Sequence, residues 1–244
     1  MRLIVLGNNG PYPSAGGACS GYLVIEGDTK ILIDCGNGVL SNLQKFIEHE
    51  DLGAVILTHL HSDHMSDMMV LRYAIQIKMN RGQDIKPLDV YAPSEPLEEY
   101  RRLDNKGVFN LNPISEDTVL NCGNLKITFK DMTHPVKCFA VAIDNTEKRF
   151  IFSGDTSWNS DIIEFSKGAD LLMLDAGLLS KDKNNDNVPH LTARECGLVA
   201  KEAKVSRLLL THFWPQDDVA NHLLEARENF EKVEIAELLK VYDI

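Results

Sequence analysis

The chain has 244 residues, of which 44% are hydrophobic and 25% charged, and its formal net charge is −11. These values are ordinary for a soluble globular protein, and the length allows a sizeable core. The acidic balance disfavours large RNA as a partner, which would need a broad basic surface, and no apolar run approaches the ~18 residues of a membrane span.

The predicted elements alternate between strands and helices along the whole chain. In the first half we expect strands at 2–6, 22–26 and 30–34, a helix at 39–49, a strand at 54–58, a helix at 67–79, a strand at 88–91 and a helix at 95–103. In the second half we expect strands at 125–131, 139–144 and 149–153, a helix at 157–166, a strand at 171–175, a helix at 193–203, a strand at 207–211, a helix at 219–230 and a strand at 234–236. Thr192 and Glu195 form a capping-box pattern, so Thr192 is expected to begin its helix.

Two β-rich halves flanked by helices favour an α/β (α+β) fold, in which two mixed sheets lie between helix layers. We expect one domain over residues 1–244. The five cysteines are odd in number and none has CxxC spacing, which argues against disulfides and a zinc ribbon. Cys35, Cys138 and Cys196 lie in apolar surroundings and are expected to be buried. The apolar run at the N-terminus is too short for a signal peptide, so a cytoplasmic protein is expected.

Three predicted strands end in Thr-His, at His59, His134 and His212. Loops at strand ends are where rigid scaffolds usually place functional residues.

The first of these strands leads into a dense cluster of possible metal ligands: His59, His61, Asp63 and His64. In an extended stretch His59 and His61 point the same way and can hold one ion, whereas Asp63 and His64 lie after a turn. Imidazole and carboxylate ligands suit Zn²⁺, Mn²⁺ or Fe²⁺.

Four residues cannot complete two metal sites, because each ion needs about four ligands. Further ligands are therefore expected at strand ends, where His134, Asp155 and His212 are the candidates. A carboxylate such as Asp155 can bridge two ions.

The ordered motifs resemble those of the metallo-β-lactamase fold hydrolases. They are His59-x-His61-x-Asp63-His64, His134, Gly154-Asp155-Thr156 and His212, preceded by Ile33-Asp34-Cys35-Gly36. The resemblance covers nearly the whole chain and implies a four-layer αββα sandwich.

By this resemblance two divalent ions would be bound, with Zn²⁺ as the default and Mn²⁺ or Fe²⁺ as alternatives. The first ion would be held by His59, His61 and His134. The second would be held by Asp63, His64 and His212, with Asp155 bridging the two. Asp34 would orient a ligand, or it only ends its strand in a turn.

The ligand set narrows the implied chemistry. True β-lactamases of this fold commonly use a cysteine ligand, and the iron-dependent redox branch has an acidic residue where this chain has His61. Neither pattern matches. The segment Val188-Pro189-His190-Leu191-Thr192 is similar to the ribonuclease Z branch, whose matching histidine assists catalysis, so His190 is a catalytic candidate beside Asp63.

The sequence leaves the roles of two further features undecided. The glycine- and proline-rich loop at residues 7–17 either lines the substrate pocket or only connects strands, and Trp214 either forms a pocket wall or packs in the core. His49 and His222 lie on predicted helices and are interpreted as structural.

We therefore expect hydrolysis by a hydroxide held between two ions, with a phosphodiester of small or cyclic nucleotide type as the first candidate substrate. A ribonuclease Z that processes tRNA 3′ ends is the alternative, but the 21 positions from His134 to Asp155 leave no room for a tRNA-gripping arm. A carboxylic ester, thioester or lactone would suit the same hydroxide. A metal-binding sensor without turnover is the non-enzyme alternative. No membrane partner is expected, and a homodimer is left open.

Overall fold

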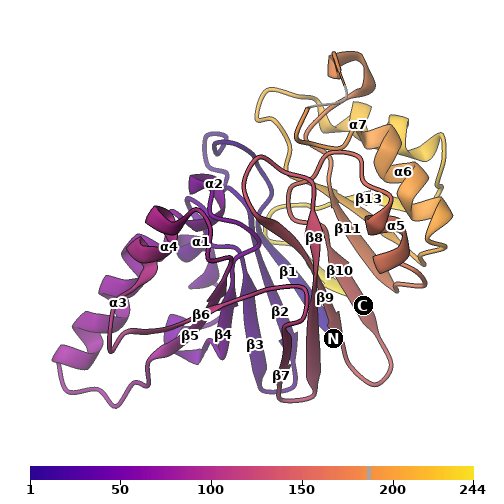
Figure 1. Cartoon of the computed structure of the whole chain (residues 1–244). Helices are drawn as coiled ribbons and strands as arrows, with labels where there is room; N and C mark the ends of the chain where they lie inside the picture. The colour runs from indigo at the N-terminus through magenta and orange to yellow at the C-terminus, as the bar shows by residue number, and fades with distance from the viewer. Residues whose placement is uncertain (186–187) are drawn as a thin grey trace.

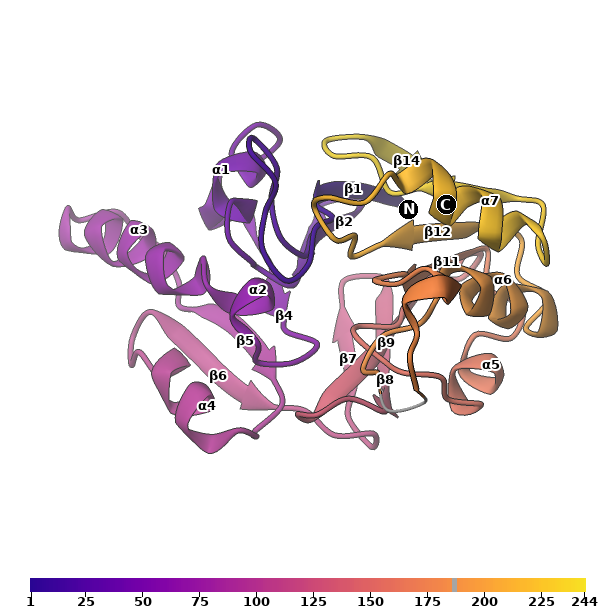
Figure 2. The ribbon, with the colours of Figure 1, turned by 90° about the horizontal axis from the view of Figure 1, so that it is seen from above.

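Two seven-stranded sheets face each other and helices cover their outer faces (Figures 1 and 2). This computed structural model describes residues 1–185 and 188–244. The strand order is β14-β1-β2-β3-β4-β5-β6 in the first sheet and β13-β12-β11-β10-β9-β8-β7 in the second. The expected four-layer αββα sandwich of mixed sheets is confirmed.

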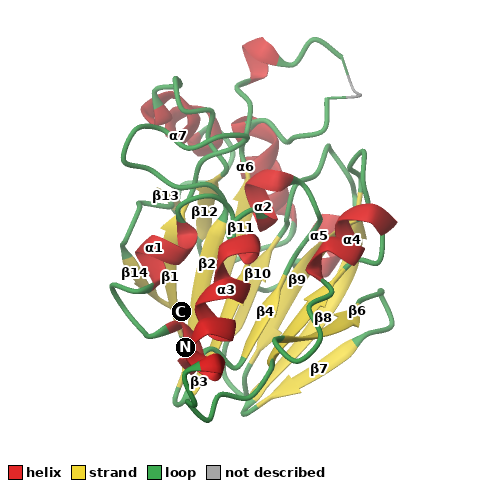
Figure 3. Ribbon diagram, turned by 90° about the vertical axis from the view of Figure 1, so that its left-hand side faces the viewer, coloured by secondary structure: helices red, strands yellow, loops and turns green. Residues whose placement is uncertain are grey.

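The first sheet is antiparallel from β14 to β3 and parallel from β3 to β6. Figure 3 shows α1 and α3 lying across its outer face. Its strands are β1 (Arg2–Gly7), β2 (Gly21–Glu26), β3 (Thr29–Ile33), β4 (Ala54–Ile56), β5 (Leu88–Ala92), β6 (Phe109–Pro113) and β14 (Val241–Asp243). The helices of this half are α1 (Val39–Leu43), η1 (His49–Asp51), α2 (Ser62–Met65), α3 (Met68–Asn80) and α4 (Leu97–Leu103).

The second sheet is antiparallel from β7 to β10 and parallel from β10 to β13. Its strands are β7 (Val119–Cys122), β8 (Leu125–Met132), β9 (Cys138–Asp144), β10 (Arg149–Phe152), β11 (Leu171–Asp175), β12 (Leu208–Thr211) and β13 (Val233–Ile235). The helices of this half are α5 (Asp161–Phe165), η2 (Ser180–Asp182), α6 (Ala193–Glu202) and α7 (Val219–Arg227).

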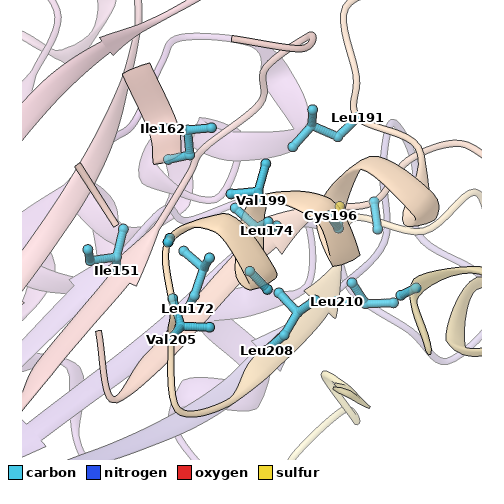
Figure 4. Packing of buried hydrophobic residues seen from close by; sticks show 14 of the residues in the cluster. Ile151, Ile162, Leu172, Leu174, Leu191, Cys196, Val199, Val205, Leu208 and Leu210 are labelled. Carbon is cyan, nitrogen blue, oxygen red and sulfur yellow. The ribbon is translucent and has the colours of Figure 1, made fainter. Parts of the chain in front are cut away.

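The central strands are apolar on both faces because each face is covered. Along β11, Leu172 and Leu174 pack against the helices of the second half (Figure 4). Leu171 and Met173 point the other way, into the layer between the two sheets. This alternation is the two-residue period of a strand, so one strand contributes to two cores.

Several element boundaries differ from the sequence expectation. The helix expected at 157–166 begins only at Asp161, because the backbone N–H and the hydroxyl of Ser157 both donate to the carbonyl of Thr133 at the end of β8. The helix expected at 39–49 ends at Leu43, and η1 follows separately. Strands β6, β7 and β14 and the single turn α2 were not expected.

Other expectations are confirmed. Thr192 forms the capping box, accepting a hydrogen bond from the backbone of Glu195 while the Glu195 carboxylate accepts one from the backbone of Thr192. All five cysteines are free, and Cys35, Cys138 and Cys196 are buried. Within residues 1–185 and 188–244, no helix combines the length and the apolar character that crossing a membrane requires.

Candidate metal centre

The candidate ligands gather where strands of both sheets end. His59 follows β4, His134 follows β8, Asp155 follows β10 and His212 follows β12. Asp155 can turn into the site because Gly154 precedes it with φ +60°, and a Cβ on Gly154 would lie 2.9 Å from Cys138 Sγ. The chain therefore brings distant residues to one edge of the sandwich.

The first group consists of His59, His61 and His134, whose ligand atoms all lie within 4.8 Å of one another. Nε2 of His59 lies 3.0 Å from Nδ1 of His61, and Nε2 of His134 lies 3.1 Å from the same Nδ1. This group could hold one ion, with His61 presenting Nδ1 and the other two imidazoles presenting Nε2.

The second group consists of Asp63, His64, Asp155 and His212. Nε2 of His64 lies 3.3 Å from Nε2 of His212. Asp155 reaches both groups, since its Oδ2 lies 3.3 Å from Nε2 of His212 and 3.8 Å from Nε2 of His59. This placement is the one that a bridging carboxylate requires.

The residues present fit two bound cations. In each group imidazole nitrogens point at one another, an arrangement that brings lone pairs together unless a cation or proton lies between them. Asp155 is buried, and its Oδ1 makes no well-oriented hydrogen bond among the described residues, although Nε2 of His64 lies 3.3 Å away. A buried carboxylate oxygen without a partner is costly, and coordination to a metal ion would satisfy it.

The electrostatics of the centre also favour positive charge. Burial disfavours the charged form of His64, yet the carboxylates of Asp155 and Asp34 overcome it and hold the pKa of His64 well above its ordinary value. By contrast, burial holds the pKa of His59 well below its ordinary value, which leaves a neutral imidazole with a free lone pair.

Hydrogen bonds to Nδ1 of two candidate ligands determine that their Nε2 atoms face the centre. Nδ1 of His64 donates to Asp34 Oδ2 at 2.7 Å, and Asp34 also accepts from the backbone and hydroxyl of Thr58. Nδ1 of His134 donates to the carbonyl of Pro189 at 3.2 Å. Each bond leaves Nε2 facing the centre, so Asp34 lies where the expected orienting role would require it, behind His64.

The chain is similar to known proteins over most of its length. The model of the Beta-lactamase superfamily domain matches residues 29–213. The probable metallo-hydrolase YhfI of Bacillus subtilis is 35% identical over 212 residues, which cover 87% of this chain and 86% of that protein. This chain belongs to the metallo-β-lactamase superfamily.

Two further likenesses support this assignment. The crystal structure of the metallo-β-lactamase fold protein YhfI from Bacillus subtilis matches with a TM-score of 0.95 and 33% identity, covering 99% of this chain and 98% of that one. Ribonuclease Z of Brevibacillus brevis is 25% identical over 276 residues, covering 84% of each protein. The chain is thus a superfamily member with ribonuclease Z among its relatives, and its fold implies divalent metal ions.

Asp175 also lies at the candidate metal centre, although the sequence analysis did not select it. It is fully buried at the end of β11, and its Oδ2 accepts a hydrogen bond from Nδ1 of His190 at 2.8 Å. Its Oδ1 lies 3.4 Å from Nδ1 of His212. The available signal was positional: Leu171–Asp175 is an apolar strand that ends in a carboxylate, as the segment before Asp155 is.

His190 joins the centre as a partly buried side chain held by Asp175. Burial disfavours its charge, but the Asp175 carboxylate overcomes that effect and raises the pKa of His190. The His190 ring stacks on that of His212 with centroids 5.1 Å apart and lies 5.8 Å from that of His134. His190 is therefore next to both candidate metal groups, and it is not a freely solvated loop residue.

The glycine-rich first loop packs against the centre. A Cβ on Gly10 would lie 2.0 Å from His212 Nε2, the nitrogen that faces the second group. The Gly10 backbone N–H donates to the carbonyl of Phe213, and the Phe213 N–H donates to the carbonyl of Asn8. Trp214 is 42% exposed, so it is not a core residue.

Proposed function

We propose that this protein hydrolyses phosphodiesters of small or cyclic nucleotide type, using two divalent ions. Zn²⁺ is the default metal, and Mn²⁺ or Fe²⁺ are the alternatives that His and Asp ligands also accept. His59, His61 and His134 would hold the first ion, and Asp63, His64 and His212 the second, with Asp155 between them. When bound, the ions would supply Lewis acidity, which lowers the pKa of an attacking water and offsets charge on phosphoryl oxygens.

The observation that carries the proposal is the His190–Asp175 pair. Asp155, Asp175, His190 and His212 have ligand atoms within 4.8 Å of one another, so His190 is within reach of a group bound at the centre. Because Asp175 holds Nδ1, Nε2 is the nitrogen of His190 that can donate a proton to a leaving oxygen. Hydrolysis of a phosphodiester releases such an alkoxide oxygen.

Asp63 has a second role in the proposal. Its Oδ2 lies 3.3 Å from Nε2 of His212 and 3.6 Å from Nε2 of His64, and its side chain is 11% exposed. A carboxylate in this position can accept a proton from the attacking water as well as contact an ion.

A ribonuclease Z activity on precursor tRNA is the second candidate, because a protein of that name is among the relatives. Two features weigh against it. Strands β9 and β10 and the turn between them occupy most of the positions from His134 to Asp155, where an RNA-gripping arm would have to be inserted. The net charge of −11 also suits a small substrate better than a large polyanion.

A substrate panel with the metal-loaded protein tests the proposal. We expect hydrolysis of bis-p-nitrophenyl phosphate, little turnover of a lactone, and no defined cleavage of a precursor tRNA. Asp155→Ala should abolish activity and lower the metal content below two ions per chain. Faster turnover of the lactone, or metal binding with no hydrolysis of any substrate, would contradict the proposal, and the second result would favour a sensor.

A further inference from the structure

Two exposed aromatic side chains lie together beside the metal centre. Tyr12 is 40% exposed and Trp214 is 42% exposed. Their ring centroids are 5.6 Å apart and their planes make an angle of 77°. Trp214 is two residues after His212, and Tyr12 is two residues after Gly10, which packs against the Nε2 atom of His212.

From this arrangement we propose that Tyr12 and Trp214 form a stacking site for the nucleobase of the substrate, whose phosphodiester lies at the metal centre. The inference rests on the proposed function and deepens it by naming the organic group that is recognised. Rings at nearly a right angle form a corner, in which a planar base can stack on one ring and meet the other edge-on.

The corner is held in place by the backbone. Gly10 and Phe213 are joined by a 3.1 Å hydrogen bond, and Asn9 Nδ2 donates to the carbonyl of Phe213. Asn9 Oδ1 accepts from the backbone and the hydroxyl of Ser14, which closes the loop around Tyr12. The loop and the segment after β12 are thus fixed to each other, and a preorganised site loses less entropy when a ligand binds.

Trp214 is exposed although the residue before it is buried. Phe213, its neighbour, is buried in the core of the second half, whereas Trp214 points outward and its Nε1 donates to Gln216 at 3.2 Å. Exposed aromatic surface that borders a polar centre is a mark of ligand sites. Stacking of one base on one aromatic ring commonly changes affinity by roughly 5- to 150-fold.

The chain offers a matched control in its other tryptophan. Trp158 is also 42% exposed, but it lines a different hollow, with Lys183, Glu195 and Leu198. Because the sequence has only two tryptophans, Trp158→Phe leaves Trp214 as the sole tryptophan, and Trp214→Phe leaves Trp158.

Fluorescence measures stacking without any turnover. In metal-loaded Trp158→Phe protein, adenosine 5′-monophosphate should quench the Trp214 emission saturably, and ribose 5-phosphate, which lacks the base, should not. Tyr12→Ala should weaken this binding about tenfold, and the Trp214→Phe protein should show no saturable quenching. Equal quenching by both phosphates, or none by either, would overturn the inference.

A second assay uses substrates with one leaving group, the p-nitrophenyl ester of thymidine 5′-phosphate and ethyl p-nitrophenyl phosphate. Trp214→Ala should lower the ratio of kcat/KM for the thymidine ester to that for the ethyl ester about tenfold. Trp214→Phe should restore part of the ratio, and Trp158→Ala should leave it unchanged. An unchanged ratio in Trp214→Ala would overturn the inference while leaving phosphodiester hydrolysis intact. Base-dependent quenching without hydrolysis of either ester would instead contradict the proposed function alone.

The same aromatic corner could be covered by a second copy of the chain. Sedimentation of the wild type and of Trp214→Ala distinguishes this outcome. A dimer that Trp214→Ala dissociates, together with no nucleotide quenching, would overturn the inference, and an unchanged oligomeric state with quenching would support it.

Discussion

At the scale of single residues, the centre depends on which nitrogen of each imidazole is held from behind. Asp34 holds Nδ1 of His64, the carbonyl of Pro189 holds Nδ1 of His134, and Asp175 holds Nδ1 of His190. Asp34 and His212 also adopt positive φ angles of 57° and 63°, which non-glycine residues rarely do. Such backbone strain is concentrated at functional sites.

Replacing Asp175 tests the role of the carboxylate behind His190. Asp175→Asn should lower kcat about 10²- to 10³-fold, because the amide no longer stabilises a charged His190. His190→Gln should lose a similar factor, and the double variant should lose little more, since the two residues act as a unit. The measurement is steady-state kinetics with metal content determined in parallel. Asp117→Asn, at an exposed position, is the control, and fully additive losses would contradict the account.

Gly10→Ala tests the contact between the first loop and His212. The added Cβ would lie 2.0 Å from Nε2, so the loop or the imidazole must move away from the second group. We expect the affinity for one of the two ions to fall at least about tenfold, roughly 1.4 kcal/mol. A competition titration with a chromophoric chelator measures it. Gly53→Ala, whose Cβ would meet only Lys30 O at 3.4 Å, should bind both ions normally; equal affinities in the two variants would refute the contact.

At the scale of elements, the central strands and most helices could be predicted because their apolar patterns are strong. β11 was expected at 171–175 and is observed there without change. The unexpected strands have weak patterns: β6 contains two asparagines and ends in Pro113, and β7 is an edge strand in which no residue is fully buried. The parallel pairing of β10 with β11 puts Asp155 and Asp175 at one sheet edge, and no local sequence pattern reveals that pairing.

The candidate ligands could be predicted because they cluster in sequence or follow strongly apolar strands. Their division into two groups came from a family resemblance, and the structure gives the distances that separate the groups. For Asp175 the sequence offers only its position at the end of an apolar strand, and the decisive observation is the 2.8 Å contact with His190, 15 positions away.

The capping box of α6 gives a stability prediction at this scale. Thr192→Ala removes the side chain that accepts the hydrogen bond from the Glu195 backbone. The free energy of unfolding should fall by about 1 kcal/mol in urea titration. Thr192→Ser keeps the hydroxyl and should lose much less. An unchanged midpoint for the alanine variant would show that the cap contributes nothing to stability.

At the scale of the whole molecule, the two candidate metal groups join the two halves. Each group combines ligands that precede α3, in the first half, with ligands that follow β8, β10 or β12, in the second. Bound ions would therefore link both sheets at the edge where their strands end. Two statements stay predictions from the sequence, namely that residues 1–244 form a single domain and that the protein is cytoplasmic. The formation of a homodimer is likewise left open by the sequence.

Metal removal should consequently destabilise the whole fold. Each ion that binds only the folded chain stabilises it by about 4 kcal/mol at a free concentration of 1,000 Kd. For a chain of this size, treatment with a chelator should therefore lower the Tm by about 10 °C for each ion that is removed. Calorimetry before and after chelation, and after metal is returned, measures the shift. An unchanged Tm in the metal-free protein would contradict the link between the halves.

The most direct test of the central claim is a metal titration of the metal-free protein, followed by hydrolysis of bis-p-nitrophenyl phosphate. The two-ion account predicts that activity rises with added Zn²⁺ or Mn²⁺ and reaches its plateau at two ions per chain. Full activity at one ion per chain, or in the metal-free protein, would contradict it.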